Sequence, residues 1–272
     1  MIRGLTALAT ALVSCLAASP AIAWGDKGHR IVAVIADSRL TPSAREGVRA
    51  LIGPATLRDA ATWADDIRRR RPETKPWHYV DIPLDRDEYL PAKDCARPRS
   101  GDCVVAAITR FQRVVADRSR PRAERGEALR FLTHFVADLH QPLHAADHRD
   151  RGGNDVKVVF FGEALHPAGR TPWNLHTVWD SGLIERRGVS VSKYAQRLTR
   201  RIARQSVDEL TGGSVVDWAL EAHQAAMDTA YRLPPDRHLG DDYAERALPV
   251  IDDMLAKAGA RLAQMLNDAL SR

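Results

Sequence analysis

Lysine is scarce in this 272-residue chain: it supplies 6 of the 40 basic residues, and the other 34 are arginine. Aromatic residues make up only 6%, and 17 glycines with 15 prolines are too few for a collagen-like or low-complexity disordered chain. No apolar run after residue 23 is long enough to span a membrane. The 44% hydrophobic and 28% charged content, with a mean hydropathy of −0.33, indicates a soluble globular protein of one large domain, or at most two.

The charge balance is basic, with a formal net charge of +5 and an isoelectric point near 9.3. Such a balance favours an anionic partner such as nucleic acid or phosphate. Arginine also suits bidentate contacts to phosphate. A GC-biased genome would give the same arginine excess, so composition alone does not decide between the two explanations.

The first 23 residues have the pattern of a secretory signal peptide. Arg3 precedes an apolar stretch from Leu5 to Leu16, and Ala21-Ile22-Ala23 is a small-x-small cleavage site. Cleavage after Ala23 would leave Trp24 as the first residue of a secreted or periplasmic protein, without stable membrane association.

Three cysteines raise two questions about processing and redox state. Cys15 ends a segment that resembles a lipoprotein cleavage box, which is the alternative to cleavage after Ala23. Cys95 and Cys103 lie eight residues apart in a loop with Pro98 and Gly101. In an oxidising compartment this pair favours a local disulfide over two free thiols.

Helical periodicity dominates the remaining chain, with apolar residues at intervals of three and four. Residues 76–83 indicate extended chain between two prolines, and Asp155–Phe161 indicates a strand in a small β-hairpin. No internal repeat or linker is visible, so residues 24–272 are expected to form one all-α domain with that hairpin. The expected helices are Ile31–Leu40, Pro42–Ile52, Leu57–Arg70, Cys103–Asp117, Pro121–Gln141, Trp173–Arg186, Val191–Val207, Val215–Tyr231 and Asp242–Leu270, with Pro249 kinking the last or lying in its first turn.

Two histidine–aspartate pairs point to metal chemistry. His134 and Asp138 are four residues apart on one expected helix, and His176 and Asp180 repeat this spacing on another, so each pair projects from one helix face. Imidazole nitrogen and carboxylate oxygen together suit zinc. Taken singly, either pair is more often an ordinary surface pair that bridges one helical turn.

The surroundings of these pairs favour the metal interpretation. The run from Phe131 to His144 is apolar, yet it holds three histidines and an aspartate that need partners. Asp65 and His78 add two ligand types beside tryptophan. At the expected mature terminus, Trp24 would offer an α-amine and a carbonyl oxygen close to His29.

On these motifs the chain resembles the zinc-dependent single-strand nuclease family of the S1/P1 type. The resemblance implies a phospholipase C/P1 nuclease-like helical fold and three zinc ions per chain in a cleft. Its matching segments cover most of the mature chain: Trp24 to His29, Trp63-Ala64-Asp65, His78-Tyr79-Val80-Asp81, His134 to His144, Gly152-Gly153-Asn154, and Asn174 to Ser181.

The resemblance also implies how the ligands divide among the ions. One zinc ion takes Asp65, His78, His134 and Asp138. A second takes the amine and carbonyl of Trp24, His29, and Asp138 as a bridge. The third takes His144, His176 and Asp180.

The implied reaction is hydrolysis of single-stranded DNA and RNA to 5′-phosphate and 3′-hydroxyl products. Two ions sharing one carboxylate would lower the pKa of a water to give hydroxide near neutral pH, and Asp65 could orient this nucleophile. Cleavage of 3′-mononucleotides and a monomeric state are further expectations.

Substrate contacts follow from the same resemblance. Tyr79 would stack on a base, and Asp81 would accept a hydrogen bond from the base edge. Arg68, where the family tends to carry a lysine, and Asn154 would contact phosphate. Stacking tolerates any base, so low sequence specificity is expected. Ordinary packing and turn capping are the alternatives for all four residues.

Other histidines are expected to have no part in the site. His140 is interpreted as structural, and the rest as surface residues: His148, His166, His223 and His238.

Two other functions stay open. A zinc phospholipase C resembles this family in fold and in its N-terminal tryptophan ligand, but it carries a glutamate where this chain has Asp180. A non-catalytic zinc-binding protein would need no open coordination position.

Overall fold

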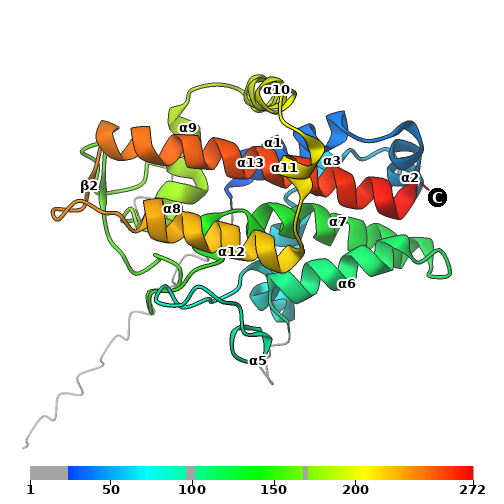
Figure 1. Ribbon diagram of the computed structural model, residues 1–272, viewed down its shortest axis with the longest axis horizontal. Coiled ribbons are helices and arrows are strands. Elements are labelled where there is room, and N and C mark those ends of the chain that lie inside the picture. Colours follow the sequence, from blue (N-terminus) through cyan, green and yellow to red (C-terminus); the bar gives the residue numbers. More distant parts are fainter. Residues whose placement is uncertain (1–23, 96–101, 168–170, 272) are drawn as a thin grey trace, which may run out of the picture.

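The computed structural model describes residues 24–95, 102–167 and 171–271, so the expected leader lies outside the described residues. Helices dominate these segments, as the periodicity predicts (Figure 1). None of these helices is both long and apolar enough to cross a bilayer. In chain order the elements are α1 (Asp26–Ser38), α2 (Pro42–Ile52), α3 (Leu57–Ala60), α4 (Trp63–Arg68), η1 (Pro72–His78), α5 (Pro91–Asp94), α6 (Val104–Ala116), α7 (Arg122–Leu139), η2 (Pro142–His144), β1 (Val159–Phe160), α8 (Leu175–Thr177), η3 (Val178–Gly182), α9 (Leu183–Arg186), α10 (Val191–Ile202), α11 (Val207–Thr211), α12 (Val215–Ala225), η4 (Ala226–Ala230), β2 (His238–Leu239) and α13 (Asp241–Leu270).

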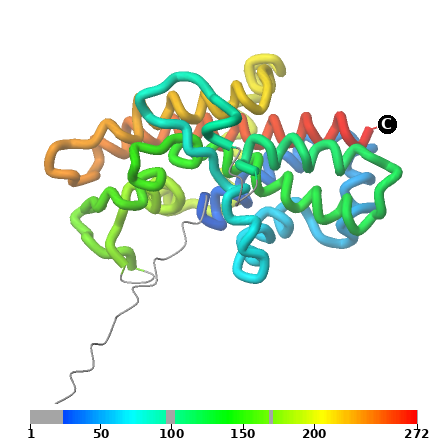
Figure 2. Tube along the Cα trace, turned by 90° about the horizontal axis from the view of Figure 1, so that it is seen from below, coloured from blue at the N-terminus to red at the C-terminus, as the bar shows by residue number. Residues whose placement is uncertain are grey.

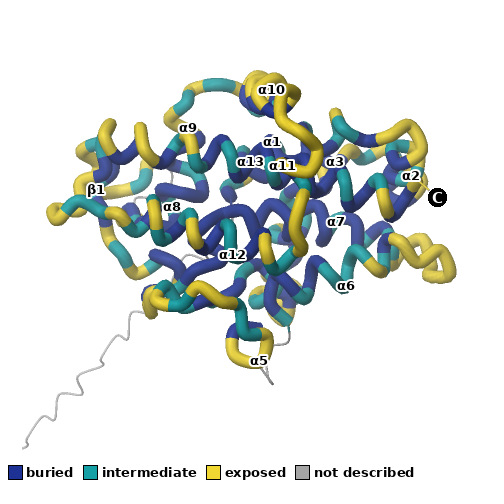
Figure 3. The backbone as a smooth tube through the Cα atoms, in the orientation of Figure 1, coloured by how far each residue is buried: buried dark blue, intermediate teal, exposed yellow. Residues whose placement is uncertain are grey.

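Three helices form the interior: α1, α7 and α13. The 30-residue α13 packs along α1, while α7 packs against α6 and also touches α1 and α13. A Cβ on Gly259 of α13 would lie 2.5 Å from the Ile35 side chain of α1, so glycine permits this close approach. Figure 3 shows α7 and much of α13 in the buried colour, whereas α10 exposes its outer side.

The second half of α7 is buried on every side. Every residue from Phe131 to Leu139 is buried, including the polar Thr133, His134 and Asp138. An interior helix has no water to solvate an imidazole or a carboxylate, so these side chains must find partners within the protein. The helix ends at Leu139, three residues before Pro142, as a proline predicts.

The first described residues lie near the middle of the molecule. Seen from below (Figure 2), the start of α1 is close to the centre of the long axis, whereas α13 ends at one extremity. At this place α1 contacts both α13 and α7.

The predicted β-hairpin is wrong in detail. The strand β1 pairs in parallel with β2, from a segment almost 80 residues later. Phe161 and Gly162 have φ of 49° and 83°, so the chain turns away immediately after the strand. Among the described residues, the antiparallel pairing of this region is limited to three isolated bridges, Lys157 with Asn174, Phe160 with Glu163, and Leu165 with Pro172.

Some helix limits also differ from the expectation. The chain at 76–78 belongs to the 3-10 helix η1 instead of an extended segment, which begins only at Tyr79. The helix expected over 57–70 is interrupted between α3 and α4, and the one over 191–207 ends at Ile202. In the second case Ser206 and Glu209 form a capping box that starts the separate helix α11. Pro249 lies inside α13, beyond its first turn.

Cys95 and Cys103 are joined by the predicted disulfide. The bond closes a short loop immediately before α6, whose first residue Val104 donates its N–H to the carbonyl of Tyr79 at 3.0 Å. The alternative of two free thiols is therefore excluded.

Candidate metal centre

The eight histidine and aspartate residues predicted as ligands come together from seven elements. They form three groups in which one donor atom from each residue lies within 4.8 Å of the others. The groups are His29, His134 and Asp138; Asp65, His78 and His134; and His144, His176 and Asp180.

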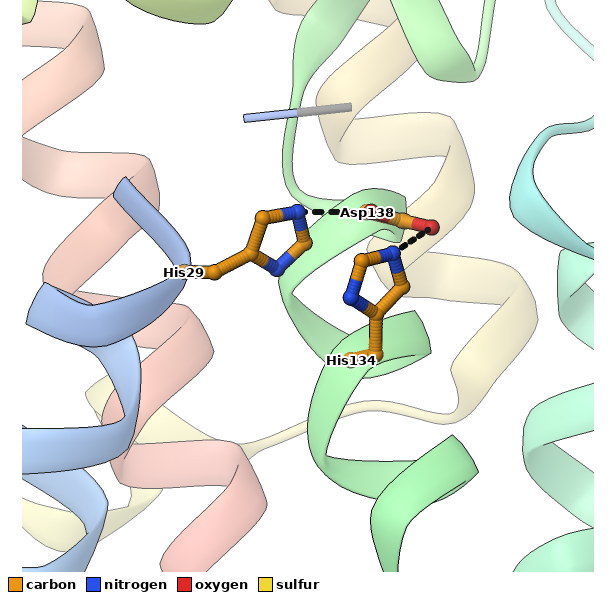
Figure 4. Close-up of side chains that lie close together, drawn as sticks. All are labelled: His29, His134 and Asp138. Carbon is orange, nitrogen blue, oxygen red and sulfur yellow. Dashed lines mark ion pairs between the residues drawn. The ribbon is translucent and has the colours of Figure 1, made fainter. Parts of the chain in front are cut away.

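Asp138 links the first two groups. Its Oδ1 lies 3.3 Å from His29 Nε2, and its Oδ2 lies 3.3 Å from His134 Nε2 and 2.9 Å from His78 Nδ1. Figure 4 shows His29 reaching the carboxylate from α1, while His134 and Asp138 project from one face of α7. The His29 and His134 rings are stacked with centroids 3.9 Å apart. One carboxylate thus faces donor nitrogens on both of its oxygens.

Asp65 completes the second group from the solvent side. Its carboxylate lies 3.9 Å from His78 Nδ1 and 3.8 Å from His134 Nε2. Its side chain is 13% exposed, whereas those of His78, His134 and Asp138 are at most 2% exposed. Asp65 is therefore the residue of this group through which a substrate and water can reach the ligands.

The third group joins the turn after α7 to the helix that starts at α8. His144 Nε2 lies 3.1 Å from His176 Nε2, which lies 3.3 Å from Asp180 Oδ2. Asn174 caps α8 through a capping box with Thr177, which fixes where this helix begins. The helix then passes into the π turn η3, which contains Asp180.

Backbone carbonyls determine the tautomers of three histidines. The Nδ1–H groups of His134, His144 and His176 donate to the carbonyls of Ala61, His78 and Gly152 at 2.6–2.7 Å. In each of them Nε2 is therefore the ring nitrogen directed to its group, and in the neutral ring it carries the lone pair. His144 and His176 consequently point two acceptors at each other, an arrangement that a cation between them would stabilise.

Burial keeps the imidazole rings of His144 and His176 in the third group neutral. Desolvation lowers the pKa of His144 to about 4 and that of His176 to about 3, so both rings are neutral at pH 7. Burial also raises the pKa of Asp180 well above its usual range. A cation beside such a buried carboxyl group would favour its ionised form.

The first two groups instead hold excess negative charge. Burial disfavours the cation of His134, but Asp138 and Asp65 outweigh burial and raise its pKa to about 9. The pKa of Asp138 is well below its usual range, because its histidine neighbours outweigh the opposing effect of burial. A proton on His134 therefore balances these carboxylates when no other cation does.

Several buried polar atoms of the first two groups have no hydrogen-bond partner within the described part of the chain, as expected of metal ligands. Among the described residues, both ring nitrogens of His29, His78 Nε2, Asp65 Oδ1 and Asp138 Oδ1 are buried without a hydrogen-bond partner. Buried polar atoms are rarely left unpaired. Nitrogen and oxygen donors in sets of three, oriented by backbone carbonyls, fit zinc.

Comparison with known proteins agrees with this chemistry. The family described as S1/P1 Nuclease matches residues 24–271. The chain belongs to the S1/P1 nuclease family. It is 31% identical to Endonuclease 2 of Arabidopsis thaliana over 90% of this chain and 89% of that protein. It is 29% identical to Nuclease S1 of Aspergillus oryzae (90% and 91% covered) and 27% identical to Nuclease P1 of Penicillium citrinum (90% and 97% covered).

Membership in the S1/P1 family decides between the functions left open. The protein is a zinc-dependent nuclease, and its three groups are compatible with three ions. The family match selects the nuclease over a phospholipase C and over a non-catalytic zinc-binding protein.

In this nuclease Trp24 is fully buried, and the residue after it contacts the third group. Gly25 donates its N–H to the carbonyl of Asp180 at 2.8 Å. A Cβ on Gly28 would lie 2.8 Å from the Cβ of Trp24, so glycine at this position leaves space for the tryptophan. The first residue of the expected mature chain is thus held against α1 and next to a ligand-bearing turn.

The four predicted substrate contacts have different surroundings. Arg68 pairs with Asp65 at 3.4 Å and is 11% exposed. Tyr79 and Asp81 are partly exposed and directly follow His78. Asn154 donates from Nδ2 to the carbonyl of Arg151 at 2.8 Å within the Gly152-Gly153 turn.

Two other histidines are buried, one against expectation. His140 donates to the carbonyl of Val136 and accepts from Arg261 at 2.8 Å, which agrees with a structural role. The expectation that His223 lies on the surface is wrong. It is 1% exposed, with Nδ1 3.1 Å from the carbonyl of Ala145, because α12 packs against η2.

Sequence reasoning did not identify Gln141. Its side chain is fully buried, and its Nε2 donates to Asp180 Oδ1 at 2.5 Å. The available signal was a long polar side chain between Asp138 and His144 in an otherwise apolar run.

Proposed function

We propose that the protein is a secreted endonuclease that hydrolyses single-stranded DNA and RNA to 5′-phosphate products. The observation that supports this most directly is the position of Asp138, whose Oδ1 faces His29 and whose Oδ2 faces His78 and His134. Donor sets that share a carboxylate hold ions close together, as in two-metal phosphodiesterases.

The proposal includes the division of ligands that the family resemblance implies. Asp65, His78, His134 and Asp138 hold one ion; Trp24, His29 and Asp138 hold a second; and His144, His176 and Asp180 hold a third. The contacts of Asp138 with His29, His78 and His134 support the first two sets. The facing lone pairs of His144 and His176 support the third.

When bound, zinc supplies Lewis acidity toward phosphate and makes water a stronger nucleophile. Asp65 orients the attacking water, because it is the exposed carboxylate of its group and its Oδ1 has no hydrogen-bond partner among the described residues. Arg68, 3.4 Å from Asp65 Oδ1, places a positive charge beside the position where phosphate must approach. The backbone-oriented histidines stay neutral and fixed throughout.

Substrate selection depends on the segment after His78. Tyr79 offers an aromatic face for stacking, and Asp81 accepts a hydrogen bond from a base edge. Stacking on a protein ring requires a base that is not already paired and stacked in a duplex, which favours single strands. Asn154 contacts phosphate, and 3′-mononucleotides are a second substrate class because they present the same base and phosphate.

The leader and assembly state belong to the same proposal. Cleavage after Ala23 frees the amine of Trp24, which lies buried at the start of α1. The disulfide fits an extracellular protein. The nuclease acts outside the cytoplasm, in the periplasm or medium, as a monomer.

The test is release of acid-soluble 5′-nucleotides from single-stranded DNA and RNA by the purified, leader-cleaved protein. Activity should disappear on chelation and return when zinc is restored. An Asp65→Asn variant should lose activity at least tenfold while Lys75→Gln, an exposed change on η1, keeps it. A zinc-loaded protein that releases no nucleotide contradicts the proposal, and phosphatidylcholine is then the substrate to try.

A further inference from the structure

The side chain of Gln141 joins Asp180 of the third group to the turn that carries His144. Gln141 lies in the turn between α7 and η2 and is fully buried. Its Nε2 lies 2.5 Å from Asp180 Oδ1, and its Oε1 lies 2.6 Å from the backbone nitrogen of Leu143. A single amide therefore bridges segments 39 residues apart in sequence.

The orientation of this amide is fixed by chemistry. The backbone N–H of Leu143 can only donate, so the oxygen of the Gln141 amide must face it. The NH₂ group then faces Asp180 and must donate to Oδ1. Asp180 Oδ1 is occupied by this bond, and Oδ2, which lies 3.3 Å from His176 Nε2, is the oxygen directed to the ligand group.

The same turn also bears on the positions of His144 and His176. The N–H of His144 donates to the carbonyl of Gln141 at 2.8 Å, so the backbone of Gln141 positions His144. The carbonyl of Leu143 would be 2.3 Å from a Cβ on Gly152, and the carbonyl of Gly152 accepts from His176 Nδ1. The turn at 141–144 thus packs directly against the backbone that orients His176.

We propose that Gln141 is a positioning residue for the third zinc ion, because its amide selects the oxygen of Asp180 that binds the ion and stabilises the turn that presents His144. This inference rests on the proposed ligand set. Partners that orient ligands typically contribute 10–100-fold to metal affinity.

The experiment measures zinc per chain in the leader-cleaved protein, equilibrated across a series of buffers with defined free zinc. Gln141→Met keeps the length of the side chain but removes both hydrogen bonds. It should bind two ions as the wild type does and bind the third about 10–100-fold more weakly. Gln141→Asn keeps an amide, but its side chain is too short to bridge both partners, so it should weaken binding of the third ion less. It replaces Gln141→Met in the experiment if that variant does not fold.

Tyr194→Phe is the matched control. It removes a buried hydrogen bond from Tyr194 to Asp252 (2.6 Å) that involves no residue of the three groups, so it should leave all three ions unchanged. The melting temperature, measured with zinc and with chelator, gives a second test. Gln141→Met should lower the melting temperature only slightly in chelator, and should reduce by a larger amount the rise in melting temperature that zinc produces.

An unchanged third-ion affinity in Gln141→Met, or an equal weakening of all three ions, overturns the inference. A wild-type protein that binds fewer than three ions instead contradicts the ligand set of the proposed function. A wild type that binds three ions but cleaves no nucleic acid contradicts the proposed activity and leaves the role of Gln141 intact.

Discussion

His144 Nδ1 donates to the backbone carbonyl of His78 at 2.7 Å, and Val80 donates its N–H back to the carbonyl of His144 at 2.8 Å. His78 belongs to the second group and His144 to the third. The backbone of one ligand therefore orients the ring of another. Ions bound at the proposed ligands would not be positioned independently, because a shift of the 78–80 segment would move residues of both groups.

Val80→Pro tests this relationship. Proline has no N–H, so the carbonyl of His144 loses its hydrogen bond from residue 80. Tyr79 already has the extended conformation (φ −149°, ψ 169°) that a following proline requires. Leaving the buried carbonyl unpaired should cost about 1–3 kcal/mol of unfolding free energy, and zinc per chain should fall. Val80→Ala removes packing but keeps the hydrogen bond, so it should lose stability without loss of zinc. Equal zinc content in both variants contradicts the relationship.

Gly28→Ala should displace Trp24. The added Cβ would lie 2.8 Å from Trp24 Cβ and 3.2 Å from Ile184, and crowding of this kind in a packed interior costs about 1–3 kcal/mol. Thermal unfolding and zinc content are the measurements, and both should decrease. Gly240→Ala is the control, because nothing lies within 4 Å of a Cβ there and its φ of −104° suits alanine. If both variants behave as wild type, the space around Trp24 is not limiting.

Local sequence patterns predicted two of the clustered pairs for a physical reason. Four-residue spacing puts His134 with Asp138, and His176 with Asp180, on one helix face whatever the rest of the chain does. The apolar run around His134 also predicted its burial, because charged or polar groups inside such a helix need partners. Helix positions followed from the same periodicity, apart from ends set by caps such as Ser206.

Contacts between distant segments could not be predicted in this way. The pairing of β1 with β2 and the burial of His223 depend on which elements pack together, which no local pattern specifies. Gln141 was missed for the same reason, since its partner Asp180 lies 39 residues away. Substrate contacts such as Tyr79 and Asn154 rested on resemblance, because an exposed tyrosine or asparagine has no distinctive spacing.

The metal-free protein should lose stability in acid. Burial depresses the pKa values of His144, His176 and His140 from 6.5 to about 4, 3 and 3. The unfolded state therefore binds more protons than the folded state below pH 6.5, and unfolding free energy should fall steadily as pH drops from about 6.5 to about 4. His134 acts in the opposite direction: its pKa of about 9 means that its contribution is lost as pH rises from about 6.5 through 9.

Urea unfolding of chelator-treated protein between pH 4 and 10 measures both effects. Stability should be greatest near pH 6.5, and His176→Gln should flatten the acid limb by about 1.4 kcal/mol for each unit of pKa shift that it removes. A profile that stays level from pH 4 to 7 would show that these rings are hydrated or protonated in the folded protein.

An extra residue before Trp24 should weaken the second ion. Trp24 is fully buried, and the following residue donates to the carbonyl of Asp180. An added methionine turns the α-amine of Trp24 into an amide. An amide nitrogen has no lone pair available for a metal at neutral pH. A cytoplasmically produced Met-Trp24 protein should therefore hold about one zinc ion fewer than the leader-cleaved protein, as the ligand count of the proposed site requires, and should lose most activity. The matched control is the same chain with an N-terminal tag that a protease removes to leave Trp24 as the first residue. Removal of the tag should restore binding of the second ion and the activity. Identical zinc content before and after removal would mean that Trp24 is only a packed core residue, and that His29 and Asp138 hold the second ion without it.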